Sequence, residues 1–131
     1  MALELQILAL AGLLAVAQLA AFAVLANLEL PQSWLVGPRD EAMPRALSPL
    51  CARMQRAFNN HVEGLVLFAV AVVAVVAGQK SSPVTEGAAV TYLVARIAYA
   101  PVYWAGVPWV RSALWALGMA ATVVMLIAAL G

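Results

Sequence analysis

The sequence predicts an all-α integral membrane protein whose single domain has four transmembrane helices. Of its 131 residues, 66% are hydrophobic and 10% are charged. A soluble domain is about half apolar and about a quarter charged. One small core cannot bury such an excess of apolar side chains, so lipid is the expected solvent. The apolar residues also gather in four long stretches, which are separated by shorter polar connections.

The first predicted span covers residues 5–28, a run of 24 residues without a charged side chain. A helix needs roughly 20 apolar residues to cross the hydrocarbon layer of a bilayer. A cleaved signal peptide is the alternative interpretation. However, the preceding segment MALELQ contains Glu4 and no Lys or Arg, so the basic region that opens a signal peptide is missing. We therefore expect a retained transmembrane helix.

Three further spans are predicted, at residues 57–78, 83–106 and 112–131. The second must begin near Ala57 or earlier, because the apolar run from Gly64 to Gly78 alone is too short to cross. The third contains Arg96 near its middle. The long polar connection before residue 50 has four prolines, which argue against one regular helix. No separate soluble domain is indicated, so residues 1–131 are expected to form one domain.

The distribution of basic residues predicts the orientation in the membrane. The first and third connections share one side and carry five arginines: Arg39, Arg45, Arg53, Arg56 and Arg111. The other side has only Lys80. Because basic residues favour the cytoplasmic side, both connections are expected in the cytoplasm and both termini on the opposite side. The net charge of +1 and the absence of a basic run give no reason to expect nucleic acid as a partner.

Polar side chains form two stripes within the predicted helices. Arg56, Asn60 and Glu63 have i, i+4, i+7 spacing and share a helix face, with Arg53 one turn earlier. Asn59 and His61 are expected to point elsewhere. A second stripe on the next span consists of Tyr92, Arg96, Tyr99 and Tyr103.

The two stripes are expected to face each other or a neighbouring subunit. A charged side chain at bilayer depth costs at least a few kcal/mol and normally faces protein or a wet cavity. One interpretation is a structural ion pair of Glu63 with Arg56 or with Arg96. The set as a whole, however, has four arginines against Glu63 and at most Glu86. This surplus of cations indicates an anionic ligand, since the planar guanidinium suits carboxylates.

The single histidine and the single cysteine carry weaker signals. His61 is interpreted as a residue at a helix surface or interface, because one lone histidine makes a poor metal site. No metal site is predicted. Cys51 is interpreted as a small loop residue, since no base is placed beside it to activate its thiol.

Two segments resemble the signatures of a known family. RMQRAFNNHVEGLVLF (residues 53–68) resembles the second-helix signature of the MAPEG proteins, membrane-associated proteins in eicosanoid and glutathione metabolism. Their pattern is R-x-x-R-A-x-x-N-x-x-E followed by an apolar run. ARIAYAPVY (residues 95–103) is similar to the third-helix signature, with an arginine seven residues before a tyrosine. The segments GPRDE and GVPWVRS resemble those of bacterial members of the family. This resemblance implies that the protein lies in a bacterial inner membrane. The resemblance extends over residues 37–112, and the order of spans fits throughout.

The resemblance implies a homotrimer of four-helix bundles that binds glutathione as a cosubstrate between subunits near the cytoplasmic face. Arg53 and Arg56 would contact the carboxylates of the tripeptide. Asn60 would form a hydrogen bond with it, and Glu63 would hold its amino group. Eukaryotic members often have an arginine near the end of the first helix, where this chain has Asn27 and Glu29.

The same resemblance assigns residues on the third and fourth spans. Arg96, Tyr99 and Tyr103 would line the glutathione site from the adjoining helix. Arg111 and Ser112 match, within one residue, a thiolate-stabilising arginine and its neighbouring serine. These two are the implied catalytic residues.

The implied activity is transfer of the glutathione thiolate to lipophilic electrophiles that enter from the bilayer, or reduction of lipid hydroperoxides. The alternative function is a non-catalytic membrane scaffold, or a lipid- or thiol-binding protein of the same fold. A transporter or channel is disfavoured, since no span is broken by a central Gly/Pro pair and the ionisable groups cluster at one end.

Overall fold

The computed structural model describes residues 1–131 and contains helices but no strands. The elements are α1 (Leu3–Glu29), α2 (Gln32–Leu35), α3 (Pro49–Ala77), α4 (Pro83–Ala105) and α5 (Pro108–Leu130). All four apolar stretches are therefore helical. The largest difference from the predicted bounds is in α3, which begins at Pro49 rather than near residue 57.

Local capping explains where the helices begin. Pro49 occupies the first turn of α3, and the side chain of Ser48 accepts a hydrogen bond of 3.1 Å from the backbone N–H of Cys51. This cap satisfies a backbone donor that the helix itself leaves free. At the start of α4, Ser82 and Thr85 form a reciprocal capping box. The early start of α3 thus follows from a Ser-Pro pair at the end of the polar connection.

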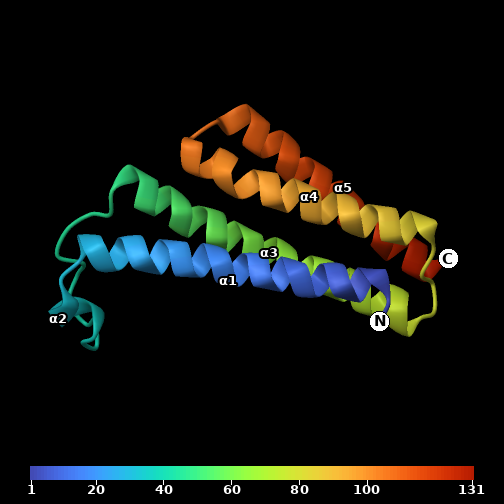
Figure 1. The fold of residues 1–131 in the computed structure, drawn as a ribbon, viewed down its shortest axis with the longest axis horizontal. Helices are drawn as coiled ribbons and strands as arrows, with labels where there is room; N and C mark the ends of the chain where they lie inside the picture. Colours follow the sequence, from blue (N-terminus) through green and yellow to red (C-terminus); the bar gives the residue numbers. More distant parts are fainter.

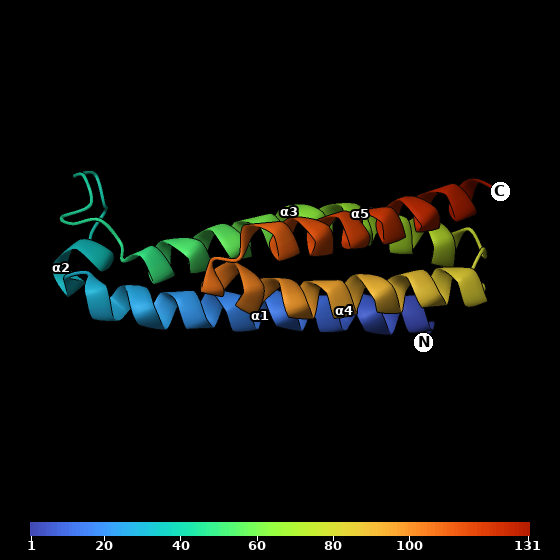
Figure 2. The ribbon, with the colours of Figure 1, turned by 90° about the horizontal axis from the view of Figure 1, so that it is seen from above.

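The four long helices lie side by side, and each neighbour along the chain runs in the opposite direction (Figure 1). Seen from above, α1 and α4 lie in one layer and α3 and α5 in the other (Figure 2). The connection from α1 to α3 and the turn from α4 to α5 lie at one end of the molecule. Both termini and the α3–α4 turn lie at the other end, which is the arrangement that the predicted orientation requires.

Three of the long helices have the length and hydropathy of membrane spans: α1, α3 and α5. The protein is therefore an integral membrane protein. The helix α4, which contains Glu86 and Arg96, has no stretch as apolar as those of these three, so its crossing of the bilayer stays a prediction. Large apolar side chains cover the outer surface of the helices, as expected for contact with lipid. Leu13 and Ile127, for example, are each 64% exposed.

The apolar core lies toward the end that holds the termini. All four long helices contribute to it, with Ile7 from α1, Phe68 from α3, Tyr92 from α4 and Met125 from α5 among its members. The rings of Phe68 and Tyr92 are stacked with centroids 3.9 Å apart. Toward the opposite end, the α4–α5 pair diverges from the α1–α3 pair (Figure 1). The large core side chains thus lie away from the end that carries the arginines.

A buried carboxylate fastens the end of the molecule that holds the termini. Glu4 is fully buried, and its Oε1 accepts hydrogen bonds of 2.6 Å from the hydroxyls of both Ser81 and Thr85. These bonds join the first turn of α1 to the connection between α3 and α4 and to the first turn of α4. They fix the position of α1 relative to α4 at the end of the molecule that holds the termini.

Candidate functional site

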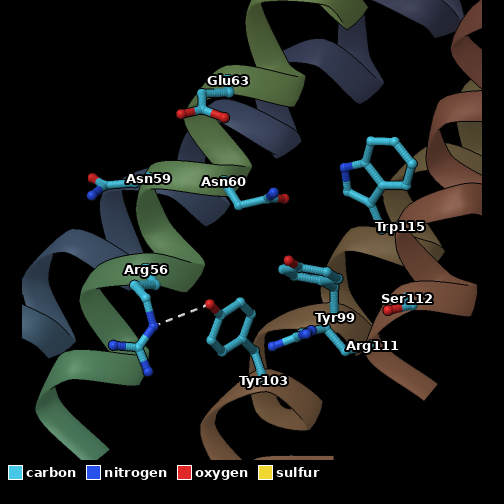
Figure 3. Close-up of a pocket in the computed structure, with 9 residues that line it drawn as sticks. All are labelled: Arg56, Asn59, Asn60, Glu63, Tyr99, Tyr103, Arg111, Ser112 and Trp115. Atoms are coloured by element: carbon cyan, nitrogen blue, oxygen red, sulfur yellow. Dashed lines mark hydrogen bonds between the residues drawn. The ribbon is translucent and has the colours of Figure 1, made fainter. Parts of the chain in front are cut away.

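A polar pocket of about 410 Å³ lies between α3 on one side and α4 and α5 on the other. This volume is within the range of about 300–1,000 Å³ that is typical of small-molecule sites. Figure 3 shows the nine lining residues. They are Arg56, Asn59, Asn60, Glu63, Tyr99, Tyr103, Arg111, Ser112 and Trp115. Seven of the nine residues predicted for the site are therefore brought together here, and Arg53 and Arg96 are not among the lining residues.

The α3 wall of the pocket consists of Arg56, Asn60 and Glu63 together with Asn59. Their spacing places the first three along one face, as the sequence predicts. Asn60 extends toward α4 and α5, whereas Asn59 points outward (Figure 3). Arg56 crosses the pocket, and its Nε donates a hydrogen bond of 3.2 Å to the hydroxyl of Tyr103 on α4. This bond connects the two sides of the pocket.

Two tyrosines and an arginine form the opposite wall. The rings of Tyr99 and Tyr103 meet edge to face with centroids 5.6 Å apart. The guanidinium carbon of Arg111, in the first turns of α5, lies 4.8 Å from the centroid of the Tyr103 ring. Such a contact holds a cation against the negative face of the ring. Ser112 follows Arg111 directly and lines the same pocket.

Arg96 lies behind this wall and is only 3% exposed. Its Nη1 donates to Oδ1 of Asn60 at 3.1 Å, and its Nε donates to Nδ1 of His61 at 3.2 Å. Its guanidinium carbon is 4.2 Å from the centroid of the Tyr99 ring. Arg96 therefore contacts two pocket residues from behind instead of lining the pocket itself.

Arg53 is turned toward the α4–α5 turn. Its Nε donates a hydrogen bond of 2.9 Å to the carbonyl of Trp104. This carbonyl belongs to the last turn of α4, where helix carbonyls lack intrahelical partners. The chain then turns at Gly106, whose φ of 78° is readily adopted only by glycine. Arg53 thus stabilises the end of α4 at the edge of the pocket.

The electrostatic balance of the site is positive. Arg56 and Arg111 line the pocket and Arg96 lies behind it, whereas Glu63 is the one acidic lining residue. Glu86 does not offset them, since it lies in the first turn of α4 at the far end. Neither suggested ion pair of Glu63 is formed, because Arg56 bonds to Tyr103 and Arg96 bonds to Asn60 and His61. The pocket is thus a cationic site with one exposed carboxylate.

The structure adds two lining residues to the pocket and corrects the position of Cys51. Asn59 points outward, as expected, yet it lines the pocket at the outer edge of α3. Trp115 is a lining residue that the sequence interpretation missed, although it is one turn beyond Arg111 on the same face of α5. Cys51 is a buried residue in the first turn of α3 rather than a loop residue, because the helix begins earlier than predicted.

Together, the fold and the site define a helical integral membrane protein with a cationic pocket at one end. Residues 7–131 match the sequence model of the MAPEG family, and the protein belongs to this family. The predicted membership of this family is thereby confirmed. Membership places the protein among membrane proteins of eicosanoid and glutathione metabolism. No curated protein and no solved structure matches the chain.

Proposed function

We propose that this protein binds glutathione in the cationic pocket and activates its thiol. The activated thiolate would be transferred to lipophilic electrophiles or would reduce lipid hydroperoxides. The observation that carries the proposal is the charge pattern of the lining residues. Glutathione has two carboxylates, one ammonium group and one thiol, and the pocket offers two arginines, one exposed carboxylate and several hydroxyl and amide groups.

The carboxylates of glutathione are matched by the guanidinium groups. In the proposed arrangement, Arg56 binds one carboxylate, because its Nε is used by Tyr103 and its two terminal nitrogens are left for a ligand. Arg53, at the edge of the pocket, supplies a second cation. Glu63 holds the ammonium group, and Asn60 donates a hydrogen bond. A forked pair of N–H donors matches the two oxygens of a carboxylate.

The thiol of glutathione is proposed to lie near Arg111 and Ser112. A free thiol has a pKa near 8.5, so it is mostly protonated at neutral pH. A nearby cation stabilises the thiolate, and each unit by which the pKa falls corresponds to about 1.4 kcal/mol. In transfer, the thiolate sulfur forms a bond with an electrophilic carbon, and a leaving group departs or the adduct takes up a proton. In hydroperoxide reduction, the thiolate would attack the peroxide oxygen, the O–O bond would break and the alcohol would leave. A second glutathione thiol would then react with the sulfenic acid so formed, giving glutathione disulfide and water.

The proposed assembly is a homotrimer of four-helix bundles in which α4 crosses the membrane with the other three long helices. Its support is the side-by-side packing of α4 with helices that are apolar enough to span. Glu63 is exposed in the single chain, and a neighbouring subunit would cover that side of the pocket. The mass of the protein within its detergent complex tests the trimer. Labelling of single cysteines introduced at the termini and in the α4–α5 turn tests the orientation.

The proposed function is tested by glutathione binding to the detergent-purified protein. Calorimetry measures the affinity, and ultraviolet absorbance of the thiolate measures activation of the thiol. We expect saturable binding with a thiolate signal that Arg111→Ala removes. Absence of binding at millimolar glutathione would contradict the proposal. It would favour the alternative function, a scaffold or a binding protein for another ligand. A screen of lipophilic electrophiles and hydroperoxides then decides between transfer and reduction.

A further inference from the structure

His61 is buried where α1, α3 and α4 meet, and both of its ring nitrogens have a partner. One nitrogen, Nε2, lies 2.9 Å from the carbonyl oxygen of Ala11 on α1. The other, Nδ1, receives the Nε–H of Arg96 at 3.2 Å. Arginine is always a donor and a carbonyl is always an acceptor. Nδ1 must therefore be unprotonated, and Nε2 must carry the hydrogen that Ala11 accepts. The two contacts are compatible with a single state, the neutral ring with its proton on Nε2.

The same bonds determine how Asn60 faces the pocket. Arg96 donates to Asn60 through Nη1, so the atom of Asn60 that receives this bond must be the oxygen Oδ1. The amide nitrogen of Asn60 then remains for the pocket, to which it offers two N–H donors. A reversed amide would set its N–H₂ group against the N–H of Arg96 and would lose the bond. The pocket therefore presents a donor, not an acceptor, at Asn60.

We propose that His61 is a positioning residue that holds Arg96, and through it Asn60, in the orientation required to recognise an anion. The relay runs from Ala11 to His61, Arg96 and Asn60. It gives α1, which contributes no lining residue, a defined effect on the pocket. The identity of the ligand as glutathione rests on the proposed function, whereas the relay itself rests on these contacts.

Loss of His61 would release Arg96. The guanidinium of Arg96 is buried, and its Nη2 already lacks a hydrogen-bond partner. Without His61, Nε would lose its partner as well, and an unsatisfied buried donor costs about 1–3 kcal/mol. The guanidinium of Arg96 is therefore expected to move toward other acceptors, and its bond to the side-chain oxygen of Asn60 is then no longer held in place. The Asn60 amide then becomes free to rotate.

Calorimetric titration of glutathione into four variants tests the relay. We expect His61→Leu and Asn60→Ala each to weaken binding about ten-fold, the usual effect of one lost hydrogen bond to a charged group. The double variant His61→Leu/Asn60→Ala is expected to bind no more weakly than either single variant. His61→Gln retains one donor and one acceptor, and it is expected to stay within about three-fold of the wild type. Additive losses, about a hundred-fold in the double variant, would overturn the relay.

A matched control separates positioning from stability. Val72→Ala removes fully buried side-chain volume in the apolar core, away from the relay. It is expected to lower the unfolding temperature while leaving the glutathione affinity unchanged. If Val72→Ala weakened binding as much as His61→Leu does, the effect of His61 would be one of general stability and the inference would fall.

A spectroscopic measurement decides the relay without glutathione. The chain has one histidine, so the ¹⁵N spectrum of the imidazole in labelled protein reports on His61 alone. We expect the neutral tautomer with the proton on Nε2, and a shift of the Nδ1 resonance in Arg96→Leu. A doubly protonated ring, or a proton on Nδ1, would overturn the inference. A wild-type protein with the expected spectrum but no affinity for glutathione would overturn the proposed function instead.

Discussion

Tyr103 lies between two arginines from different helices. The guanidinium carbon of Arg111 is 4.8 Å from the centroid of its ring, and Nε of Arg56 donates to its hydroxyl at 3.2 Å. One side chain on α4 thus joins a cation on α3 to a cation on α5. Because each cation uses a different part of Tyr103, the two contacts can be removed separately. The first two predictions depend on this arrangement.

Replacement of Arg111 should reduce activation of the glutathione thiol more strongly than it reduces binding of the tripeptide. Arg111→Ala removes the proposed counter-charge of the thiolate, while Arg56 keeps its place on the opposite wall. We expect the pKa of the bound thiol to rise by at least about one unit, or 1.4 kcal/mol, which lowers the thiolate absorbance at neutral pH by up to about ten-fold per unit. The affinity for glutathione, measured by calorimetry, should fall by a smaller factor.

Two variants serve as controls for Arg111. Arg111→Lys keeps the charge and should retain part of the thiolate signal. Lys80→Ala removes a cation from the exposed turn at the opposite end and should change neither binding nor absorbance. An equal loss of signal in Lys80→Ala would show that the effect comes from net charge rather than from the position of Arg111.

The hydroxyl and the ring of Tyr103 should have different effects. Tyr103→Phe removes the acceptor of the Arg56 bond but keeps the aromatic face that contacts Arg111. We expect a loss of about two- to ten-fold in glutathione affinity, since one hydrogen bond contributes about 0.5–1.5 kcal/mol. The thiolate absorbance of the bound complex should be unchanged. Tyr103→Leu removes the ring as well and should lower the thiolate absorbance too. Equal thiolate signals in the two variants would contradict a role of the ring in placing Arg111.

The buried carboxylate of Glu4 should affect stability without affecting the site. Glu4→Leu removes the acceptor shared by Ser81 and Thr85 at the end opposite the pocket. We expect a loss of about 1–3 kcal/mol in stability, the usual cost of unsatisfied buried polar groups. The unfolding temperature in detergent measures the loss, and glutathione affinity should stay unchanged. Glu86→Leu is the matched control, because Glu86 is a nearby carboxylate on α4 that accepts neither of these bonds. A similar loss in Glu86→Leu would refute the assignment to the Glu4 hydrogen bonds.

The packing of α5 on α4 should depend on the small size of Gly118. A Cβ atom at Gly118 would lie 3.7 Å from Cδ2 of Tyr92 and 3.8 Å from Cδ of Arg96. These are ordinary contact distances, so Gly118→Ala should be tolerated. Gly118→Leu requires α5 to move away from both side chains and should disturb Arg96. We expect Gly118→Leu to weaken glutathione binding and to lower the unfolding temperature, and Gly118→Ala to do neither. Ala120→Leu, at an exposed position on α5, is the control for the size of the added side chain.

Local patterns were enough to predict the helices and much of the site. The length of each apolar run determines whether it can span a bilayer, and 3.6-residue periodicity places Arg56, Asn60 and Glu63 on one face. These relationships hold within a single helix, so no knowledge of packing is needed. The family signatures added the assignment of Arg111 and Ser112, which no spacing within one helix links to α3.

Other features depend on how the helices rotate and diverge. Arg53 and Arg56 are neighbours on α3, yet one bonds to the end of α4 and the other crosses the pocket. The opening between α3 and α4 depends on the angle between whole helices, which no pattern within one helix predicts. Asn59 and Trp115 also line the pocket, one from α3 and the other from α5.

By itself, the sequence determined that this protein is helical, lies in a membrane and carries the MAPEG signatures, because these properties follow from composition, period and local motif. The tertiary structure alone decided which polar residues meet. Arg96 is behind the pocket, held by His61 on α3 and indirectly by Ala11 on α1. The physical reason is that a buried guanidinium must find acceptors wherever packing places them, and these acceptors are distant in the chain.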